Sequence, residues 1–118
     1  MSSFLSIVFI GNVGKTPELR KTQKDESVCS FSVAVNEVTA DGQESVTWFD
    51  VSAWGRLAEV CAEYLVKGSK VLIRASNVKT HAFTYENGEP GASLKVTARE
   101  VKFLGSPRRE EQQSEIPF

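Results

Sequence analysis

Residues 46–54 read V-T-W-F-D-V-S-A-W, and this stretch decides the fold. Side chains of a strand point alternately to its two faces. One face of this segment therefore carries Thr47, Phe49, Val51 and Ala53, which suits a core. The other face carries both tryptophans of the chain together with polar side chains. Because each large ring left in water forgoes roughly a few kcal/mol of burial energy, the pattern indicates a stacking surface, for which nucleobases are the natural partners.

The flanking sequence predicts four more strands and one helix. The strand patterns cover residues 4–10, 29–36, 71–85 and 94–104. The helix is expected at residues 56–67, and its apolar stripe consists of Leu57, Val60, Cys61, Tyr64 and Leu65. Gly68 follows directly, where a left-handed residue would end the helix.

Turn residues connect these segments into a recognisable order. Asp-Gly at residues 41–42 and Asn-Gly at residues 87–88 predict hairpin turns, and Pro-Gly at residues 90–91 predicts an irregular tip for the second hairpin. The order of three strands, a helix and a hairpin is typical of an all-β OB-fold. This fold is a five-stranded Greek-key barrel with its helix between strands 3 and 4, and here a long strand 4–5 hairpin. We expect one domain at residues 1–105 and a short disordered tail at residues 106–118.

Composition is that of a soluble globular chain, with 41% hydrophobic and 25% charged residues and a net charge of −1. Cys29 and Cys61 are too few for a disulfide framework and lie in apolar patterns, so buried free thiols in a reducing cytoplasm are expected. The apolar run at residues 7–10 is too short to span a membrane, and no signal peptide or membrane partner is expected. A near-neutral chain can still present a basic face if its acids lie elsewhere.

Two apparent catalytic or cofactor-binding motifs are incomplete. Gly14, Lys15 and Thr16 resemble the end of a phosphate-binding loop, but the position five before Gly14 is Phe9 instead of glycine. His81 is the only histidine, and no metal-ligand spacing surrounds it, so a surface histidine near nucleic acid is favoured over a metal ligand. No nucleophile–base pair is evident. We therefore predict no enzyme, no metal and no cofactor.

Three stretches of the chain resemble the bacterial single-stranded DNA-binding protein family. They are G-N-V-G-K-T-P-E-L-R (11–20), W-F-D-V-S-A-W-G-R-L-A-E-V-C-A-E-Y-L-V-K-G-S-K-V (48–71) and E-I-P-F (115–118). The resemblance implies an OB-fold, typically a homotetramer, that binds and protects single-stranded DNA with little sequence preference. It also implies a role in DNA replication, recombination and repair in the cytoplasm, in association with the nucleoid.

The sequence departs from the family pattern in three places. Residues 36–40 hold no aromatic side chain, whereas family members often carry another tryptophan there. Residues 74–83 look one residue longer than usual, which leaves the facing of Phe83 open. Only about a dozen residues separate Gly105 from the terminus, so the usual long linker is nearly absent.

Aromatic residues are the main candidates for DNA contact. Trp48 and Trp54 lie six residues apart, roughly 20 Å along a strand, and each is expected to stack on a base. The alternative is that one ring covers a barrel end or a subunit contact. Phe83 occupies a place where the family has a stacking aromatic, with core or interface packing as its alternative.

Basic residues are the second group of candidates. As a set they could pair with DNA phosphates, although each alone is equally explained as a solvated surface charge. The expected DNA-binding cations are Lys15, Arg20, Arg56, Lys67, Arg74, Lys79 and Lys95. Arg56 is expected beside the ring of Trp54.

The end of the chain is a candidate partner-binding element. Its acidic and hydrophobic residues, Glu115, Ile116, Pro117 and Phe118, suit a pocket with a basic rim, and the resemblance implies docking of replication, recombination and repair proteins. The alternative is a passive solubilising tail. Two rival functions also stay open: a partner-recruiting module that binds DNA weakly, and an OB domain that binds RNA or sugars.

Overall fold

The computed structural model describes residues 2–105. The four expected partner-binding residues at positions 115–118 lie outside this range. Six strands and one helix are present in the order β1 (Ile7–Val13), β2 (Glu18–Lys21), β3 (Ser27–Val38), β4 (Glu44–Trp54), α1 (Arg56–Tyr64), β5 (Lys70–Thr84) and β6 (Pro90–Gly105). The predicted class, with one helix between two groups of strands and a long final hairpin, is confirmed.

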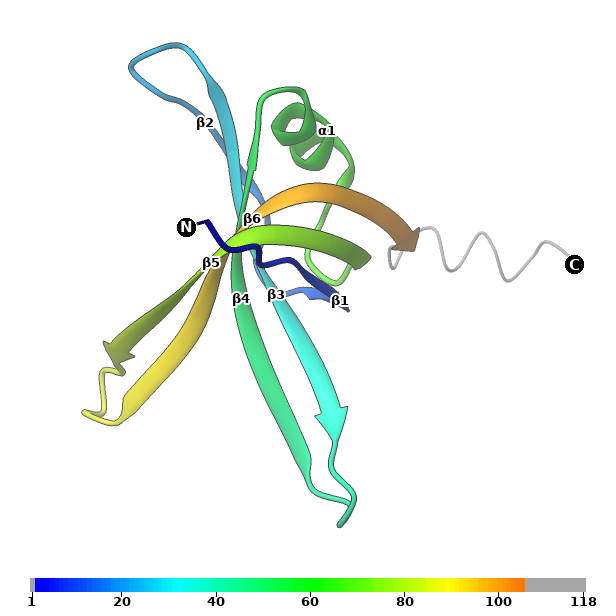
Figure 1. The fold of residues 1–118 in the computed structure, drawn as a ribbon, viewed down its shortest axis with the longest axis vertical. Helices are drawn as coiled ribbons and strands as arrows, with labels where there is room; N and C mark the ends of the chain where they lie inside the picture. The colour runs from blue at the N-terminus through cyan, green and yellow to red at the C-terminus, as the bar shows by residue number, and fades with distance from the viewer. Residues whose placement is uncertain (1, 106–118) are drawn as a thin grey trace, which may run out of the picture.

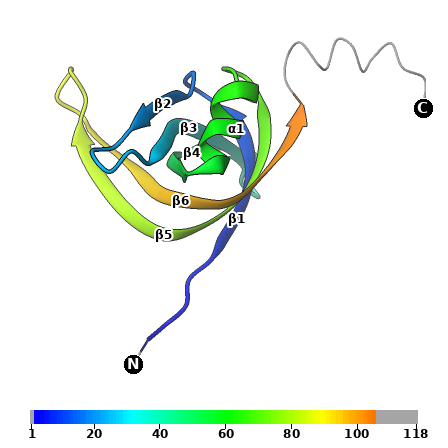
Figure 2. The same ribbon diagram turned by 90° about the horizontal axis from the view of Figure 1, so that it is seen from above.

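The strands close into a barrel (Figures 1 and 2). Their order is β1-β5-β6-β4-β3-β2, and β1 also pairs with β3, which closes the barrel. The β4–β6 pairing is parallel and the other pairings are antiparallel. The β3–β4 and β5–β6 hairpins extend beyond the barrel, as Figure 1 shows. These two arms enlarge the outer surface available to a ligand.

The core follows the alternation expected for β4. Phe49, Val51 and Ala53 are buried, and the ring of Phe49 stacks on that of Phe9 at a centroid distance of 3.9 Å. Helix α1 lies across one end of the barrel (Figure 2) and contributes Ala58 and Cys61 to the core. The opposite faces of the strands are thereby left for solvent and ligands.

Both cysteines are free and buried, as predicted. Burial raises the pKa of the Cys29 thiol. It also raises the pKa of Cys61 to about 12, with a smaller contribution from the nearby Cys29. Because the thiolate is the reactive form, both side chains are inert packing groups.

Several predicted boundaries are wrong by a few residues. The first strand begins at Ile7, and an additional strand, β2, lies between the first two predicted strands. All four residues of β2 are exposed, so it has no apolar alternation to reveal it. In the second hairpin, Pro90 and Gly91 belong to β6 instead of the loop. Pro90 is tolerated there because it is the first residue of the strand.

The helix ends at Tyr64, three residues earlier than predicted. Leu65 adopts an extended conformation and is buried, and the Val66 amide donates a hydrogen bond to Ser69 Oγ at 3.0 Å. Gly68 has a positive φ of 94°, but it donates its amide to the Val13 carbonyl and does not cap the helix. Tyr64, placed in the apolar stripe, is exposed. Docking of this turn on β1 therefore ends the helix early.

A β-bulge in β5 settles which way its outer half faces. Ser76 pairs with Thr97 and Lys79 pairs with Lys95, so three residue steps on β5 match two on β6. Asn77, inside the bulge, has a φ of 53°, a conformation that asparagine tolerates better than most residues. Before the bulge the odd-numbered residues of β5 point inward, and after it they point outward. The bulge accounts for the extra residue noted in the sequence.

Candidate nucleic-acid interface

The outward face of β4 carries both tryptophans, as the alternation predicts. Trp48 and Trp54 are 41% and 45% exposed, and Asp50 and Ser52 lie between them on the same face. Neither ring is part of the core. Two large rings that keep almost half of their surface in water, separated by polar side chains, form a surface suited to stacking ligands.

The ring of Trp48 packs against the backbone at Gly14, in the loop after β1, and we call this packing site its seat. A Cβ atom placed on Gly14 would lie 2.6 Å from Cζ3 of the Trp48 ring, so only glycine allows the ring to lie this close to the backbone. Ala34 is the cross-strand partner of Trp48, and its small side chain leaves room beside the ring. The seat holds the ring in place before any ligand arrives, which reduces the entropy lost on binding.

Trp54 borders a separate hollow of about 420 Å³ formed with the β2–β3 turn. Its other lining residues are Thr22, Gln23, Lys24 and Glu26. Arg56 is exposed at the start of α1, and Arg56 does not line this hollow. The cation lining the hollow with the ring is Lys24, which was not among the predicted cations.

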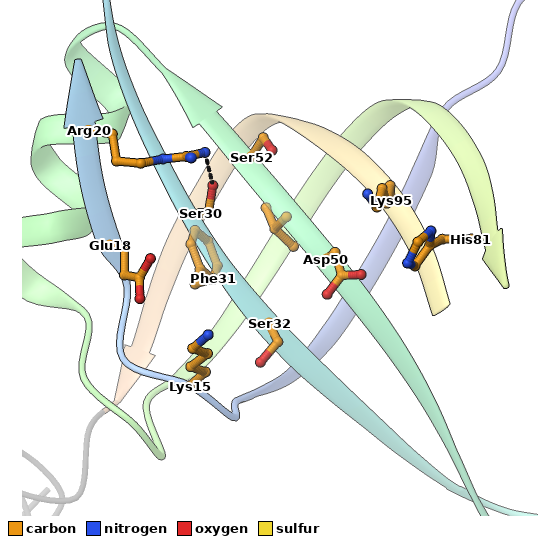
Figure 3. A pocket seen from close by; sticks show the side chains of 11 residues that line it. Lys15, Glu18, Arg20, Ser30, Phe31, Ser32, Asp50, Ser52, His81 and Lys95 are labelled. Atoms are coloured by element: carbon orange, nitrogen blue, oxygen red, sulfur yellow. Dashed lines mark hydrogen bonds between the residues drawn. The ribbon is translucent and has the colours of Figure 1, made fainter. Parts of the chain in front are cut away.

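A cleft of about 390 Å³ crosses the outer face between β2 and β5 (Figure 3). We call it the central cleft. It combines cationic, acidic and hydroxyl side chains around two buried residues, and it is lined by Lys15, Glu18, Arg20, Ser30, Phe31, Ser32, Asp50, Val51, Ser52, His81 and Lys95. Three of the predicted cations, Lys15, Arg20 and Lys95, thus line the same cleft. Arg20 on β2 and Lys95 on β6 are separated in the sheet by β3 and β4.

Hydrogen bonds order the polar side chains of the central cleft. Arg20 Nη2 donates to Ser30 Oγ at 3.4 Å, as drawn in Figure 3. Ser93 Oγ donates to Asp50 Oδ2 at 2.7 Å. Asp50 and the three serines of the cleft could not be predicted as site residues, because small polar residues on a strand are ordinary at any solvated face. Their cross-strand register was the missing information.

The β5–β6 arm continues this surface with a row of aromatic rings. Phe83 stacks on His81 at a centroid distance of 5.8 Å and meets Tyr85 edge-on at 5.0 Å. A Cβ atom on Gly91, opposite Phe83, would lie 2.5 Å from the Phe83 ring. Phe83 is therefore half-buried on the hairpin itself, outside the core cluster. His81, Phe83 and Tyr85 are spaced two residues apart, which is the spacing of side chains on one face of a strand. This spacing could have indicated Tyr85 as a further stacking candidate.

Two other predicted cations border a second cleft, of about 580 Å³, beside the N-terminal segment. Arg74 and Lys79 line it together with Arg99 and the exposed Phe4. Arg99 Nε donates to Ser76 Oγ at 2.7 Å. Lys67, in contrast, is exposed in the turn after α1 and lines none of the clefts described above. The predicted cations are thus distributed over several parts of the barrel.

Two further findings bear on function. Among residues 2–105, no group of three His, Cys, Asp or Glu side chains is placed to hold a metal ion. No helix within the same range is long and apolar enough to cross a membrane.

Comparisons with known proteins agree with this geometry. The chain is 33% identical over 103 residues to "Single-stranded DNA-binding protein 1" of Synechocystis sp., covering 87% of this chain and 85% of the relative. It is 31% identical over 120 residues to "Single-stranded DNA-binding protein" of Neisseria meningitidis, covering 98% of this chain and 67% of the relative.

A solved structure confirms the OB-type fold. The small single-stranded DNA-binding protein from Streptomyces coelicolor superposes with a TM-score of 0.68 at 22% identity, covering 86% of this chain and 95% of that one. A model of the Single-strand binding protein family matches residues 4–104, which is nearly the whole described barrel. The chain therefore belongs to the single-strand binding protein family.

Proposed function

We propose that this protein binds single-stranded DNA by stacking bases on Trp48, Trp54 and Phe83 and pairing phosphates with the surrounding cations. The observation that carries the proposal is the position of both tryptophans, partly exposed on one outward strand face at the borders of hollows. Family membership supports it and agrees with the prediction that the chain is not an enzyme.

The shape of the surface favours a single strand over a duplex. A ring can stack on a base only when the base has left its own stack, and each such contact contributes about 1–3 kcal/mol. Lys15, Arg20 and Lys95 line one cleft, so that phosphates of a flexible backbone can pair with them over a short distance. Stacking of this kind tolerates every base, so the binding depends little on sequence.

The opposite side of the barrel supports the expected homotetramer. Val8, Ile10 and Leu104 are exposed on the outward surface of β1 and β6, with the half-buried Leu72 between them on β5. We call these four residues the aliphatic face. Contiguous aliphatic side chains in water are characteristic of surfaces that pack against another protein. We propose that a second copy of the chain covers them.

The cellular role is inferred from the family and from the end of the chain. We propose that the protein protects single strands during DNA replication, recombination and repair in the cytoplasm, near the nucleoid. Glu115, Ile116, Pro117 and Phe118 would recruit partner proteins through their combination of acidic, aliphatic and aromatic groups. This second part rests on the sequence alone.

A titration with oligo-dT of graded length, followed by tryptophan fluorescence and mass, tests the proposal. We expect tight binding that weakens as salt rises, because phosphate contacts release counterions. Trp54→Ala should weaken binding by about 1–3 kcal/mol, while Trp54→Phe should retain part of the stacking. Ile10→Ala, on the aliphatic face, serves as the matched control and should leave the affinity for a short oligonucleotide unchanged.

Three results would contradict the proposal. Unchanged affinity of Trp54→Ala at matched salt would exclude stacking on that ring. Tighter binding of oligo-rU than of oligo-dT would favour the RNA-binding alternative. Weak binding of oligo-dT at low salt, with partner binding lost on deletion of residues 115–118, would favour the recruiting module.

A further inference from the structure

We propose that Asp50 reads the bases in the central cleft, so that the protein prefers bases that carry an exocyclic amino group, such as cytosine. The proposal rests on the proposed function, because it concerns the same DNA-binding surface. It adds a graded base preference to binding that is otherwise tolerant of sequence.

Asp50 is one of the two acidic side chains that line the central cleft, the other being Glu18. Asp50 lies on β4 between its cross-strand neighbours, Ser32 on β3 and Lys95 on β6. Figure 3 shows its carboxylate pointing into the space bordered by Ser32, Lys95 and His81. The residue is half-buried and lines the cleft, so part of its side chain is accessible to a ligand there.

The carboxylate is held in place and keeps room for more donors. Ser93, itself only 8% exposed, donates to Oδ2 at 2.7 Å and so fixes the orientation of the Asp50 side chain. An ionised carboxylate can accept about four hydrogen bonds through its two oxygens, and Ser93 supplies one of them. Because Asp50 lines the central cleft, its remaining acceptor sites are available to a ligand there.

Charge decides which part of the DNA approaches Asp50. Phosphates are repelled by the carboxylate and attracted by Lys15, Arg20 and Lys95 around it. A base edge therefore lies nearest to Asp50 when the backbone follows the cations. In a single strand the pairing edges of the bases are free to donate.

Cytosine and uracil differ in what they offer to such an acceptor. Cytosine presents an amino group at C4, for which Asp and Glu are natural acceptors, whereas uracil presents a carbonyl oxygen at the same place. Uracil donates only from its N3–H, which lies between two carbonyl oxygens that repel a carboxylate, so uracil is the poorer partner for Asp50. Oligo-dC and oligo-dU therefore form the cleanest pair of probes, because both are pyrimidines and neither carries the methyl group of thymine.

The test measures the affinities of oligo-dC and oligo-dU of equal length at pH 8 and matched salt. We expect wild type to bind oligo-dC about fivefold more tightly, at the low end of the discrimination by one base contact, because Asp50 is only half-buried. Asp50→Asn should strengthen binding of both, by removing a negative charge, and should reduce the ratio to within twofold of one. An amide can present either its oxygen or its amino group, so it serves both bases.

Two controls separate base reading from charge and from folding. Glu63→Gln removes one negative charge from exposed α1 and should leave the ratio unchanged. Oligo-dC methylated twice at N4 cannot donate from that position, so wild type should bind it no better than oligo-dU. This second probe needs no variant and therefore does not depend on the folding of Asp50→Asn.

The outcomes are distinct for the two proposals. Equal affinity of wild type for oligo-dC and oligo-dU, or a ratio unchanged in Asp50→Asn, would overturn base reading and leave Asp50 as a local partner of Ser93. Failure of wild type to bind either oligonucleotide would instead overturn the proposed function itself.

Discussion

Two outer faces of the barrel expose similar fractions of large apolar side chains, yet they differ in shape and surroundings. On the outward face of β4, Trp48 and Trp54 are 41% and 45% exposed and polar side chains separate them. On the aliphatic face, Ile10 and Leu104 are 48% and 44% exposed. Exposure alone therefore does not distinguish a ligand surface from a subunit surface.

The difference between the faces lies in the geometry of their side chains. Flat rings with polar neighbours stack on planar ligands and leave room for charged backbones. Branched aliphatic side chains have no preferred planar partner and gain most by packing against similar side chains. The two faces are thus suited to different partners, and each can be altered without the other.

The largest expected effect is on assembly. Ile10→Asp places an unpaired charge on the aliphatic face, which would cost about 3 kcal/mol or more if a second subunit buries it. We expect analytical ultracentrifugation to show a smaller oligomer at the same protein concentration. The affinity of each barrel for a short oligonucleotide should stay within threefold of wild type. Unchanged mass would show that the aliphatic face is not a subunit contact.

An intermediate effect is expected at the seat of Trp48. Gly14→Ala would force the ring to shift, because the new Cβ would lie 2.6 Å from it, and DNA binding should weaken by about 1–2 kcal/mol. The same substitution made in Trp48→Ala should cost little further affinity. A double-mutant cycle measures this coupling, with the affinities determined by a method that does not depend on tryptophan fluorescence. Additive losses would indicate that Gly14 acts on DNA without Trp48.

The smallest effect concerns salt dependence. Replacing Lys95 by Gln in the central cleft should reduce the slope of log affinity against log salt by about 0.7, the value for one phosphate contact with a single strand. Lys102→Gln, on β6 beside the aliphatic face, is the matched control and should leave the slope unchanged. An equal reduction of the slope in both variants would show that phosphate contacts are not confined to the central cleft.

Local patterns were sufficient for much of the fold. The alternation of residues 46–54 correctly placed Phe49 and Val51 inside and the tryptophans outside. The helix position followed from its apolar stripe, because Leu57, Cys61 and Leu65 of that stripe pack on the barrel core. The hairpin turns at Gly42 and Gly88 are confirmed, with φ values of 85° and 87°.

Features that depend on tertiary contacts could not be predicted. The early end of α1 depends on a hydrogen bond from Gly68 to Val13, more than fifty residues apart in sequence. The convergence of Lys15, Arg20 and Lys95 depends on the register of β2, β3, β4 and β6. The proximity of Lys24 to Trp54 could not be predicted, because it depends on the β2–β3 turn, which lines the same hollow as the ring.

The bulge at Asn77 has a consequence for how such proteins diversify. A single codon gained or lost there would exchange the sides of every residue on the outer half of β5, moving His81 away from the central cleft and its neighbours Thr80 and Ala82 toward it. The inward half, which holds Val71 and Ile73 in the core, would keep its packing. A single insertion or deletion at this position can therefore change which side chains face a ligand while the packing of the barrel core is retained.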